Sequence, residues 1–237
     1  KNVDVLTIEI EHVNVDALKK LKSEGVKVYP EPEALEIIGN KCLQKTHYAN
    51  HQIATAPFQN FESTADAKKA TLSFPCVWKS ATGGYDGKGV KILKTIEDFN
   101  ELPNVPCLIE ELIDFEKELA VIVASSASGE QKSYPVVGMD FHPEANQVEF
   151  VVCPANIDDT IANKARELAL KVAKSLGVTG LLAVELFLAK DGSIYVNEVA
   201  PRPHNSGHYS LEGSYTDQFE QHIRAILDLP LGATDSK

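Results

Sequence analysis

Apolar and polar positions along this chain follow two different periods, which predict a mixture of helices and strands. Short runs rich in β-branched and aromatic residues, bounded by Gly, Pro or Asn, are typical of strands, whereas apolar positions three and four residues apart are typical of amphipathic helices. The predicted strands lie at 3–10, 26–30, 74–80, 90–93, 106–113, 118–130, 131–142 and 149–155, followed by a two-strand hairpin around 191–192. The predicted helices lie at 14–23, 32–38, 40–51, 95–102, 158–177 and 219–227.

The order of the first elements predicts the tail of an α/β domain at the start of the chain. Residues 3–30 are predicted as strand, helix and strand, which is typical of the last unit of such a domain, and Pro30 and Pro32 mark a boundary after it. The rest of the chain is rich in predicted strands. Because the chain starts at Lys1 and its only methionine is Met139, we expect further residues upstream.

Composition and charge limit the class of partner. The chain has 237 residues, 43% of them hydrophobic and 24% charged, which is ordinary for a globular protein with one large or two modest domains. A net charge of −11 argues against nucleic acid as a partner, because binding to a phosphate backbone needs a basic surface. No apolar run approaches the roughly 18 residues of a membrane span, and no signal peptide is visible, so we expect a cytoplasmic protein without a membrane partner.

The four cysteines predict buried thiols rather than a metal or disulfide framework. They are widely spaced, at Cys42, Cys76, Cys107 and Cys153, and none forms a CxxC pair. Cys76 and Cys107 lie in apolar, strand-like surroundings, where a free thiol packs as a small hydrophobic group.

The segment 183–208 carries the densest chemistry of the chain. Apolar residues lead up to the Asp-Gly pair at 191–192, which is a strong signal for a two-residue hairpin turn. If these two residues make the turn, Leu188 faces Tyr195 and Glu185 faces Glu198. Directly opposite residues share a face of the sheet, with Cβ atoms about 4.5–5.5 Å apart.

Two carboxylates placed in this way repel each other unless a cation lies between them. The hairpin therefore predicts a site for a divalent cation at Glu185 and Glu198, and Mg²⁺ suits their oxygen atoms. Asn197 adds an amide oxygen next to them. Two alternatives stay open at this point: an exposed hairpin whose acids face water, and a one-residue bulge that shifts the register.

Three other segments carry candidate binding groups. The glycine-rich segment 82–89 lies between two predicted strands, so it is neither a Walker P-loop nor a Rossmann turn; together with Lys79 it is suited to hold a triphosphate. Glu110, Glu111 and Glu118 end an apolar strand or follow it closely, and carboxylates there can accept hydrogen bonds from ribose hydroxyls. A plain glycine turn and a solvated acidic turn are the structural alternatives.

The segment PRPHNSGH at 201–208 directly follows the acidic strand. It supplies Arg202, His204, Asn205 and His208, a set rich in groups that bind anions. A loop without function is seldom so dense in such groups, so we interpret the segment as a site for an anionic substrate just beyond the metal.

In this order, these segments resemble the ATP-grasp superfamily, and more closely its 5-(carboxyamino)imidazole ribonucleotide synthases of purine biosynthesis. The matching words are TIEIEHV (7–13), YPEPEALEIIGNK (29–41), GGYDGKG (83–89), IEELIDFEKELAVIVA (109–124), GLLAVELF (180–187), VNEVAPRPHNSGHYS (196–210) and DQFEQHIRAILDLPLG (217–232). They cover almost the whole chain, and the glycine loop together with NEVAPRPHNSGH is specific to these synthases.

The resemblance implies an ATP-grasp fold in which two α+β subdomains hold ATP between them. It implies that residues 1–30 end a preceding α/β domain, that 31–237 form the ATP-grasp domain with parts at about 31–106 and 107–237, and that a small C-terminal domain is absent. The implied activity is that of a carbon–nitrogen ligase: ATP phosphorylates bicarbonate to carboxyphosphate, and aminoimidazole ribonucleotide is carboxylated. It also implies a homodimer.

The resemblance further implies a role for individual residues. It assigns ATP binding to Lys79, Gly84, Tyr85, Asp86, Gly87, Lys88, Gly89, Glu110, Glu111, Leu112, Ile113, Glu118, Asn197 and Glu198. It assigns Mg²⁺, or alternatively Mn²⁺, to Glu185 and Glu198. It assigns the bicarbonate and nucleotide end of the site to Tyr85, Asp86, Lys88, Arg202, His204 and Asn205.

The chain departs from the family pattern at two positions. Lys88 stands where an arginine is common, so a bidentate contact becomes a point charge. The segment before His142 lacks the acidic-Asn-Val-His pattern that often follows this strand, so no role is assigned to His142. Two other hypotheses are a different ATP-grasp ligase, such as one that uses formate or an amino acid, and a non-catalytic nucleotide-binding module.

Overall fold

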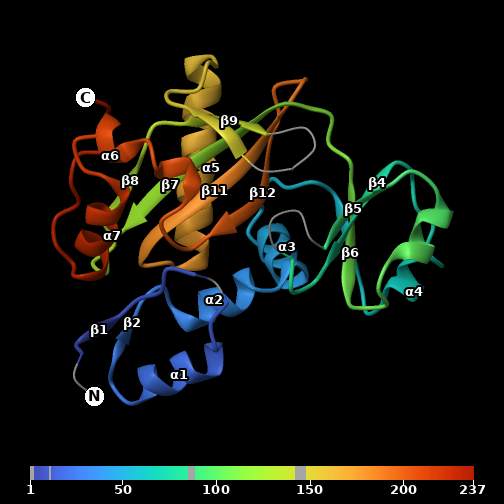
Figure 1. Ribbon diagram of the computed structural model, residues 1–237, viewed down its shortest axis with the longest axis horizontal. Coiled ribbons are helices and arrows are strands. Elements are labelled where there is room, and N and C mark those ends of the chain that lie inside the picture. Colours follow the sequence, from blue (N-terminus) through green and yellow to red (C-terminus); the bar gives the residue numbers. More distant parts are fainter. Residues whose placement is uncertain (1–2, 11, 85–88, 142–147) are drawn as a thin grey trace.

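The computed structural model describes residues 3–10, 12–84, 89–141 and 148–237 (Figure 1). Its helices are α1 (Val15–Ser23), α2 (Pro32–Ile38), α3 (Lys41–Asn50), α4 (Thr64–Ala67), α5 (Asp159–Leu176), α6 (Ser210–Gly213) and α7 (Gln218–Ile226), with 3-10 helices η1 (Ile96–Glu101) and η2 (Asn205–Gly207). Its strands are β1 (Val5–Leu6), β2 (Lys27–Val28), β3 (Phe58–Phe61), β4 (Cys76–Ser80), β5 (Val90–Leu93), β6 (Cys107–Glu111), β7 (Phe115–Ser125), β8 (Gln131–Ser133), β9 (Val137–Phe141), β10 (Val148–Val152), β11 (Gly180–Ala189) and β12 (Ile194–Ala200).

The strands form three sheets in the part of the chain that the structure describes. β1 and β2 pair in parallel, a four-stranded sheet has the order β3-β6-β4-β5, and a six-stranded sheet has the order β10-β9-β7-β11-β12 with β8 paired to β7. In Figure 1 the four-stranded and six-stranded sheets are separate bodies, with α3 between them. This segregation of helices and mainly antiparallel sheets confirms the predicted α+β class.

The N-terminal unit is a small parallel strand–helix–strand. Asn14 caps α1, because its side chain accepts a hydrogen bond from the backbone N–H of Ala17 at 3.0 Å. Leu18 of α1 packs with Ile8 and with Val28 of β2. The strand predicted over 3–10 is wrong in extent: β1 has two residues, because β2 offers only two partners for it.

The four-stranded sheet is built around β4, whose five residues are all buried. Trp78 of β4 packs with Phe99 and Ile109 in the core beneath this sheet. The helix predicted over 95–102 is the 3-10 helix η1. Its start is fixed by Asp98, whose carboxylate accepts the backbone N–H of Thr95 at 2.9 Å and closes a capping box.

The six-stranded sheet carries the larger core. Its central strands β7 and β11 are antiparallel, and Val121 and Val184 from one face pack against Val172 of α5. Side chains alternate between the two faces of a strand, so Leu181 and Glu185 of β11 lie on the other face. Helix α7 covers that face at the Leu181 end, and the Glu185 end is left for polar groups.

The predicted register of the β11–β12 hairpin is wrong next to its turn. Leu188 pairs with Ile194 and not with Tyr195, and the backbone N–H of Ala189 donates to the carbonyl of Ser193 at 2.9 Å. The connection is therefore a three-residue loop that ends in Gly192, whose φ is +81°. Such loops close with a left-handed residue, and Gly takes that conformation without a steric penalty.

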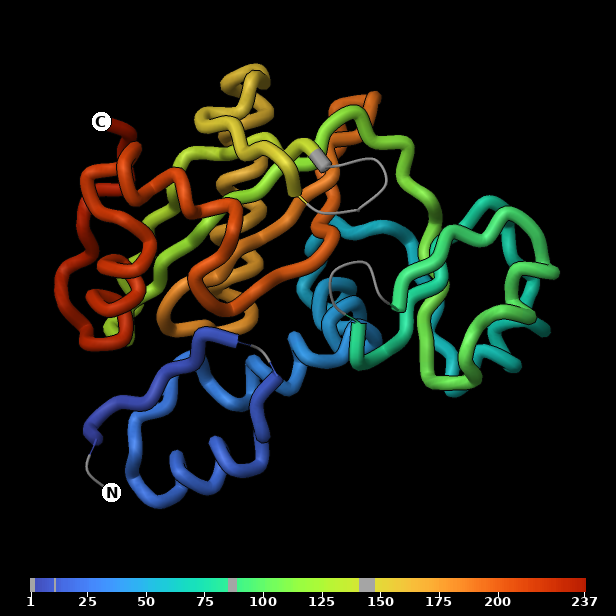
Figure 2. The backbone as a smooth tube through the Cα atoms, viewed as in Figure 1, coloured from blue at the N-terminus to red at the C-terminus, as the bar shows by residue number. Residues whose placement is uncertain are grey.

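The division of the chain into parts stays a prediction, and the position of β6 bears on it. The predicted break at about residue 107 comes at the start of β6, yet β6 pairs with β3 and β4 in the four-stranded sheet. The chain passes to the six-stranded sheet after Glu111, as the green segment in Figure 2 shows.

Cys76 and Cys107 are buried free thiols, as predicted, whereas Cys42 and Cys153 are free thiols that are only partly buried. Burial raises the pKa of the Cys76 and Cys107 thiols. Among the described residues, no helix is long and apolar enough to span a membrane.

Candidate functional site

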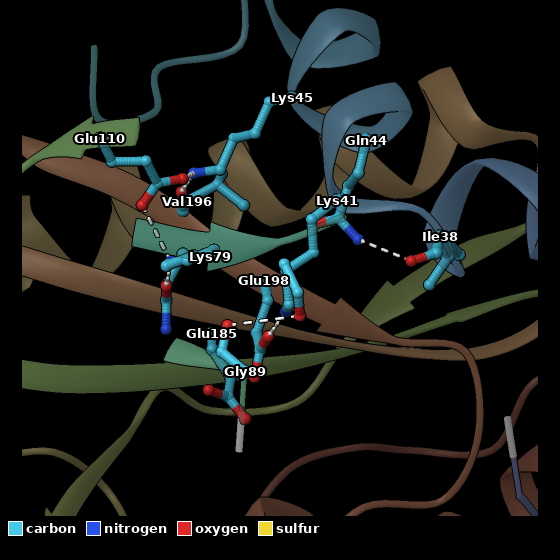
Figure 3. Close-up of polar contacts among 12 residues, drawn as sticks. Ile38, Lys41, Gln44, Lys45, Lys79, Gly89, Glu110, Glu185, Val196 and Glu198 are labelled. Atoms are coloured by element: carbon cyan, nitrogen blue, oxygen red, sulfur yellow. Dashed lines mark hydrogen bonds and ion pairs between the residues drawn. The ribbon is translucent and has the colours of Figure 1, made fainter. Parts of the chain in front are cut away.

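A cluster of charged side chains lies where α3 and both large sheets meet (Figure 3). Helix α3 contributes lysines, the four-stranded sheet contributes Lys79 and Glu110, and the hairpin β11–β12 contributes Glu185 and Glu198. Ion pairs join residues that lie far apart in the sequence: Lys41 with Glu198, and Lys45 and Lys79 with Glu110.

A β-bulge brings the two hairpin carboxylates together. Val184 pairs with Val199 and Leu186 pairs with Val196, so Glu185 alone lies opposite Asn197 and Glu198. The turn is one residue longer than predicted, and the extra residue on β12 shifts the pairing back by one, so the predicted register holds again beyond the bulge. The predicted proximity of Glu185 to Glu198 therefore holds, with Asn197 beside them, although for a different reason.

The electrostatics of the carboxylates point to a missing positive charge. Burial, together with the charges of Glu198 and Glu118, raises the pKa of Glu185 to about 8. Burial and the charge of Glu198 raise the pKa of Glu118 to about 7. A buried carboxyl group flanked by carboxylates is held in its protonated form until a cation neutralises it.

Lys41 supplies part of the counter-charge and was not found from the sequence. It is the first residue of α3, and its ammonium group forms a short ion pair with Glu198. Burial by itself raises the pKa of Glu198, but the charge and hydrogen bond of Lys41 outweigh it and lower that pKa. The pKa of Glu198 is thus lowered, whereas that of Glu185 is raised.

A second ionic group lies deeper. Glu110 bridges two lysines, with 2.8 Å from one oxygen to Lys45 Nζ and 2.8 Å from the other to Lys79 Nζ. The side chains of Lys45 and Glu110 are only 2% and 4% exposed. Lys79 also donates to Asn197 Oδ1 at 3.1 Å, which joins this group to the hairpin.

The two lysines of α3 show what sequence reasoning missed. Lys41 and Lys45 are four residues apart, so they lie on one face of the helix that Asn40 caps. That spacing was a usable signal. The sequence contains no signal that these lysines are buried against acids of two different sheets, because nothing in the local pattern predicts that packing.

The segment after β12 places its imidazole against the carboxylates. His204 Nε2 lies 3.4 Å from Glu185 Oε1, and the His204 side chain is 12% exposed. The backbone N–H of Ser206 donates to His204 Nδ1 at 3.3 Å, which leaves the ring proton on Nε2, facing Glu185. Arg202 Nη1 donates to the carbonyl of Pro203 at 2.8 Å, and Asn205 is exposed at the start of η2.

The glycine loop is anchored at both described ends. The backbone N–H of Ser80 donates to the carbonyl of Gly89 at 2.9 Å, and Gly83 and Gly89 have φ of +77° and +73°. Glycine suits position 89 because its backbone is left-handed, and a Cβ there would also lie 2.4 Å from Ser80 Oγ. Gly84 is partly buried. Four predicted site residues lie outside the described residues, as does His142; the four are Tyr85, Asp86, Gly87 and Lys88.

The predicted nucleoside end is spread along the connection from β6 to β7. Glu110 is buried and ion-paired, whereas Glu111 is exposed on the opposite face of β6. Leu112 is 40% exposed and Ile113 is half-buried. Glu118 is half-buried on β7, where it faces the hairpin carboxylates.

The donor set fits a magnesium ion that is shared with a nucleotide. Within the described ranges, no group of three or more His, Cys, Asp or Glu side chains is arranged to hold a metal by itself. Glu185 and Glu198 offer carboxylate oxygens, and Mg²⁺ in proteins is often held by one or two carboxylates plus phosphate oxygens of the substrate.

Family models match nearly the whole chain. An ATP-grasp domain model matches residues 46–219, and a ribonucleotide synthetase preATP-grasp domain model matches residues 1–39. The second match agrees with the predicted α/β tail before the main domain.

Named relatives extend the comparison. The chain is 42% identical to a phosphoribosylaminoimidazole carboxylase of Ogataea methanolica, covering 96% of this chain and 43% of that protein. It is 39% identical to an N5-carboxyaminoimidazole ribonucleotide synthase of Mycobacterium tuberculosis, covering 98% and 56%. The crystal structure of an N5-carboxyaminoimidazole synthase of Aspergillus clavatus, in complex with ADP and 5-aminoimidazole ribonucleotide, matches with a TM-score of 0.89 and 38% identity over 98% of this chain and 62% of that one. The chain thus spans about half the length of the curated relatives it matches.

Proposed function

Because the chain belongs to the ATP-grasp family, we propose that it is the ATP-binding part of an enzyme that carboxylates 5-aminoimidazole ribonucleotide. The enzyme is a carbon–nitrogen ligase of purine biosynthesis. ATP and bicarbonate give carboxyphosphate, and the carboxyl group passes to the amine to give N5-carboxyaminoimidazole ribonucleotide, ADP and phosphate.

The observation that carries this proposal is the contact between His204 and Glu185. Many ATP-grasp enzymes need a lysine and two acids for ATP and its metal. Here the segment 201–208, which is rich in anion-binding groups, is seated directly against those acids. That position suits an anionic acceptor which must approach the terminal phosphate of ATP.

On this proposal, the ion pairs position the groups that receive ATP. Lys79 is held between Glu110 and Asn197, and Lys41 is held by Glu198, so both ammonium groups are fixed before the phosphates arrive. Preorganised charges of this kind stabilise the transition state of phosphoryl transfer without reorganisation. Gly84 and Gly89 border the loop that would cover the phosphates.

Glu185 and Glu198 would hold the magnesium ion, with Asn197 beside them. When bound, the ion neutralises phosphate charge and orients the terminal phosphate for in-line transfer. Glu185 would bind the ion in its ionised form. His204 Nε2, at 3.4 Å, is the nearest imidazole group of the described site that can hydrogen-bond to it.

At the acceptor end, Arg202, His204 and Asn205 would bind bicarbonate and the nucleotide. Guanidinium and amide groups present several donors to carboxylate and phosphate oxygens. Glu110 to Ile113 and Glu118 would border the adenosine end, where Glu118 would accept hydrogen bonds from ribose hydroxyls.

The test is the release of ADP by the full-length enzyme with Mg²⁺-ATP and bicarbonate, with and without aminoimidazole ribonucleotide. Strong stimulation by the nucleotide is the expected result. ADP release that is indifferent to the nucleotide would overturn the proposal, and formation of acyl phosphate from formate would point to another ligase of the family. Failure of Mg²⁺-ATP to raise the melting temperature would point to a module without nucleotide binding.

A homodimer and a cytoplasmic location belong to the same proposal. Both follow from the class of enzyme. Light scattering on the full-length protein checks the first, and fractionation of cells that express it checks the second.

A further inference from the structure

Gln218 is a fully buried polar side chain that makes two hydrogen bonds to the loop of the acceptor site. It is the first residue of α7 and its relative exposure is 0%. Its Oε1 accepts the backbone N–H of His204 at 2.9 Å, and its Nε2 donates to the backbone carbonyl of His204 at 3.0 Å. The amide therefore satisfies both backbone groups of His204, as a neighbouring strand would do.

Two further contacts lock this arrangement. Ser210 Oγ accepts the backbone N–H of Gln218 at 3.0 Å and donates to the carbonyl of Gly207 at 2.6 Å. Gly207 lies so close that a Cβ there would be 2.4 Å from Gln218 Oε1 and 2.2 Å from Ile122 Cδ1. The loop is thus held against β7 and α7, with no room to shift toward them.

The fixed backbone sets where the His204 ring points. The ring takes the backbone N–H of Ser206 on Nδ1 and directs Nε2 to Glu185 at 3.4 Å. Arg202 and Asn205 lie within two residues of the same anchor. A displacement of about 1 Å at such groups is enough to reduce a rate strongly, because the reacting atoms are then out of line.

We propose that Gln218 is a positioning residue for the acceptor nucleotide. By holding the backbone of His204, it places the segment from Arg202 to Asn205 against Glu185 in the geometry that the anionic acceptor needs. This inference rests on the proposed function and assigns Gln218 no contact with substrate.

The chain offers a matched control in Gln221 on the same helix. Gln221 is also 0% exposed, and it binds both backbone groups of Gly232, accepting the N–H at 2.8 Å and donating to the carbonyl at 3.1 Å. The segment around Gly232 carries none of the predicted site residues. Gln218→Met and Gln221→Met thus each remove two side-chain hydrogen bonds to a backbone N–H and carbonyl, at His204 and at Gly232 respectively, with little change in side-chain shape.

The experiment measures ADP release by the full-length enzyme against the concentration of each substrate. For Gln218→Met, we expect KM for aminoimidazole ribonucleotide to rise about tenfold, the equivalent of one lost buried hydrogen bond, with KM for ATP within about twofold of the wild type. For Gln221→Met, we expect KM for aminoimidazole ribonucleotide and KM for ATP to stay at the wild-type values. We expect the two variants to lower the melting temperature by similar amounts, because each loses two buried hydrogen bonds.

Ser210→Ala is a milder second variant, in case Gln218→Met does not fold. It removes the hydroxyl that links Gln218 to Gly207, and we expect KM for the acceptor to rise about threefold. Equal KM values for Gln218→Met and Gln221→Met, or an unchanged KM in Ser210→Ala when Gln218→Met is unfolded, would overturn the inference alone. A wild-type enzyme that is indifferent to aminoimidazole ribonucleotide would overturn the proposed function and the inference with it.

Discussion

At the scale of the residue, the site is a set of acids that differ in how their charge is balanced. Glu198 has Lys41 as a partner, and Glu110 has two lysines, whereas Glu185 has the carboxylates of Glu198 and Glu118 beside it and the imidazole of His204 at 3.4 Å. Among these three acids, Glu185 is therefore the one whose charge is least balanced by a cationic partner. That is the condition in which a divalent cation binds most favourably.

We expect Glu185→Gln to leave the free protein as stable as the wild type or more stable, by about 1 kcal/mol, because it removes a carboxyl group crowded by two others. The same change should abolish the rise in melting temperature that Mg²⁺-ATP produces. Thermal unfolding with and without Mg²⁺-ATP measures both. Glu198→Gln is the control: it loses the ion pair with Lys41, so a gain in stability in that variant would contradict this account.

The buried pair of Lys45 and Glu110 makes an opposite prediction. Lys45→Met should lower the free energy of unfolding by about 3 kcal/mol, because Glu110 then keeps a single partner in a buried site. Adding Glu110→Gln should restore part of that loss, since no carboxylate is then left short of a partner. Urea unfolding of the two variants and the wild type tests this, and a double variant no more stable than Lys45→Met would show that packing, not charge, is what Lys45 provides.

At the scale of the element, local signals fixed the ends of the long helix. Asp158 accepts the backbone N–H of Thr160 at the start of α5, and Gly177 ends the helix with φ +64°. Both signals are contained in a few neighbouring residues, so they can be read without the fold.

We expect Gly177→Ala to lower the free energy of unfolding by about 1 kcal/mol, because a Cβ is strained in the left-handed conformation. A Cβ at this position would meet no atom within 4 Å, so the loss comes from the backbone and not from a clash. Gly177→Asn should lose less, since Asn tolerates this conformation. Chemical unfolding of both variants is the measurement, and equal losses would argue against a backbone origin.

At the scale of the whole molecule, a buried histidine joins the N-terminal unit to the six-stranded sheet. His222 Nδ1 accepts the backbone N–H of Leu181 at 3.2 Å, and Nε2 lies 2.8 Å from Thr7 Oγ1. Burial lowers the pKa of His222 to about 4, so the ring is neutral in the folded protein.

This histidine should make the protein sensitive to acid. The unfolded chain takes up the proton near pH 6.5 and the folded protein only near pH 4, so its stabilising effect is complete above pH 6.5 and is lost as the pH falls toward 4. The loss amounts to at most about 3 kcal/mol. His222→Gln should show a flatter dependence of unfolding free energy on pH in this range, and an unchanged slope would contradict the assignment.

The amino-acid sequence was sufficient for the longer helices, for most strands and for the types of residue in the site, because periodicity, caps and turn residues act over a few positions; it missed the four-residue helices α4 and α6. It predicted Lys79, Glu110, Glu185, Asn197, Glu198 and His204 as site residues, and the fold brings them together.

Contacts between distant segments depended on the tertiary structure alone. The turn of the hairpin was predicted one residue too short, and only the bulge opposite Glu185 brought Glu198 back beside it. Lys41 and Lys45 acquire their roles because α3 packs between two sheets whose strands come later in the chain. Gln218 acquires its role because α7 packs beneath the loop that holds His204. The physical reason is that burial and pairing of charge are properties of the packed chain, and no short stretch of sequence contains them.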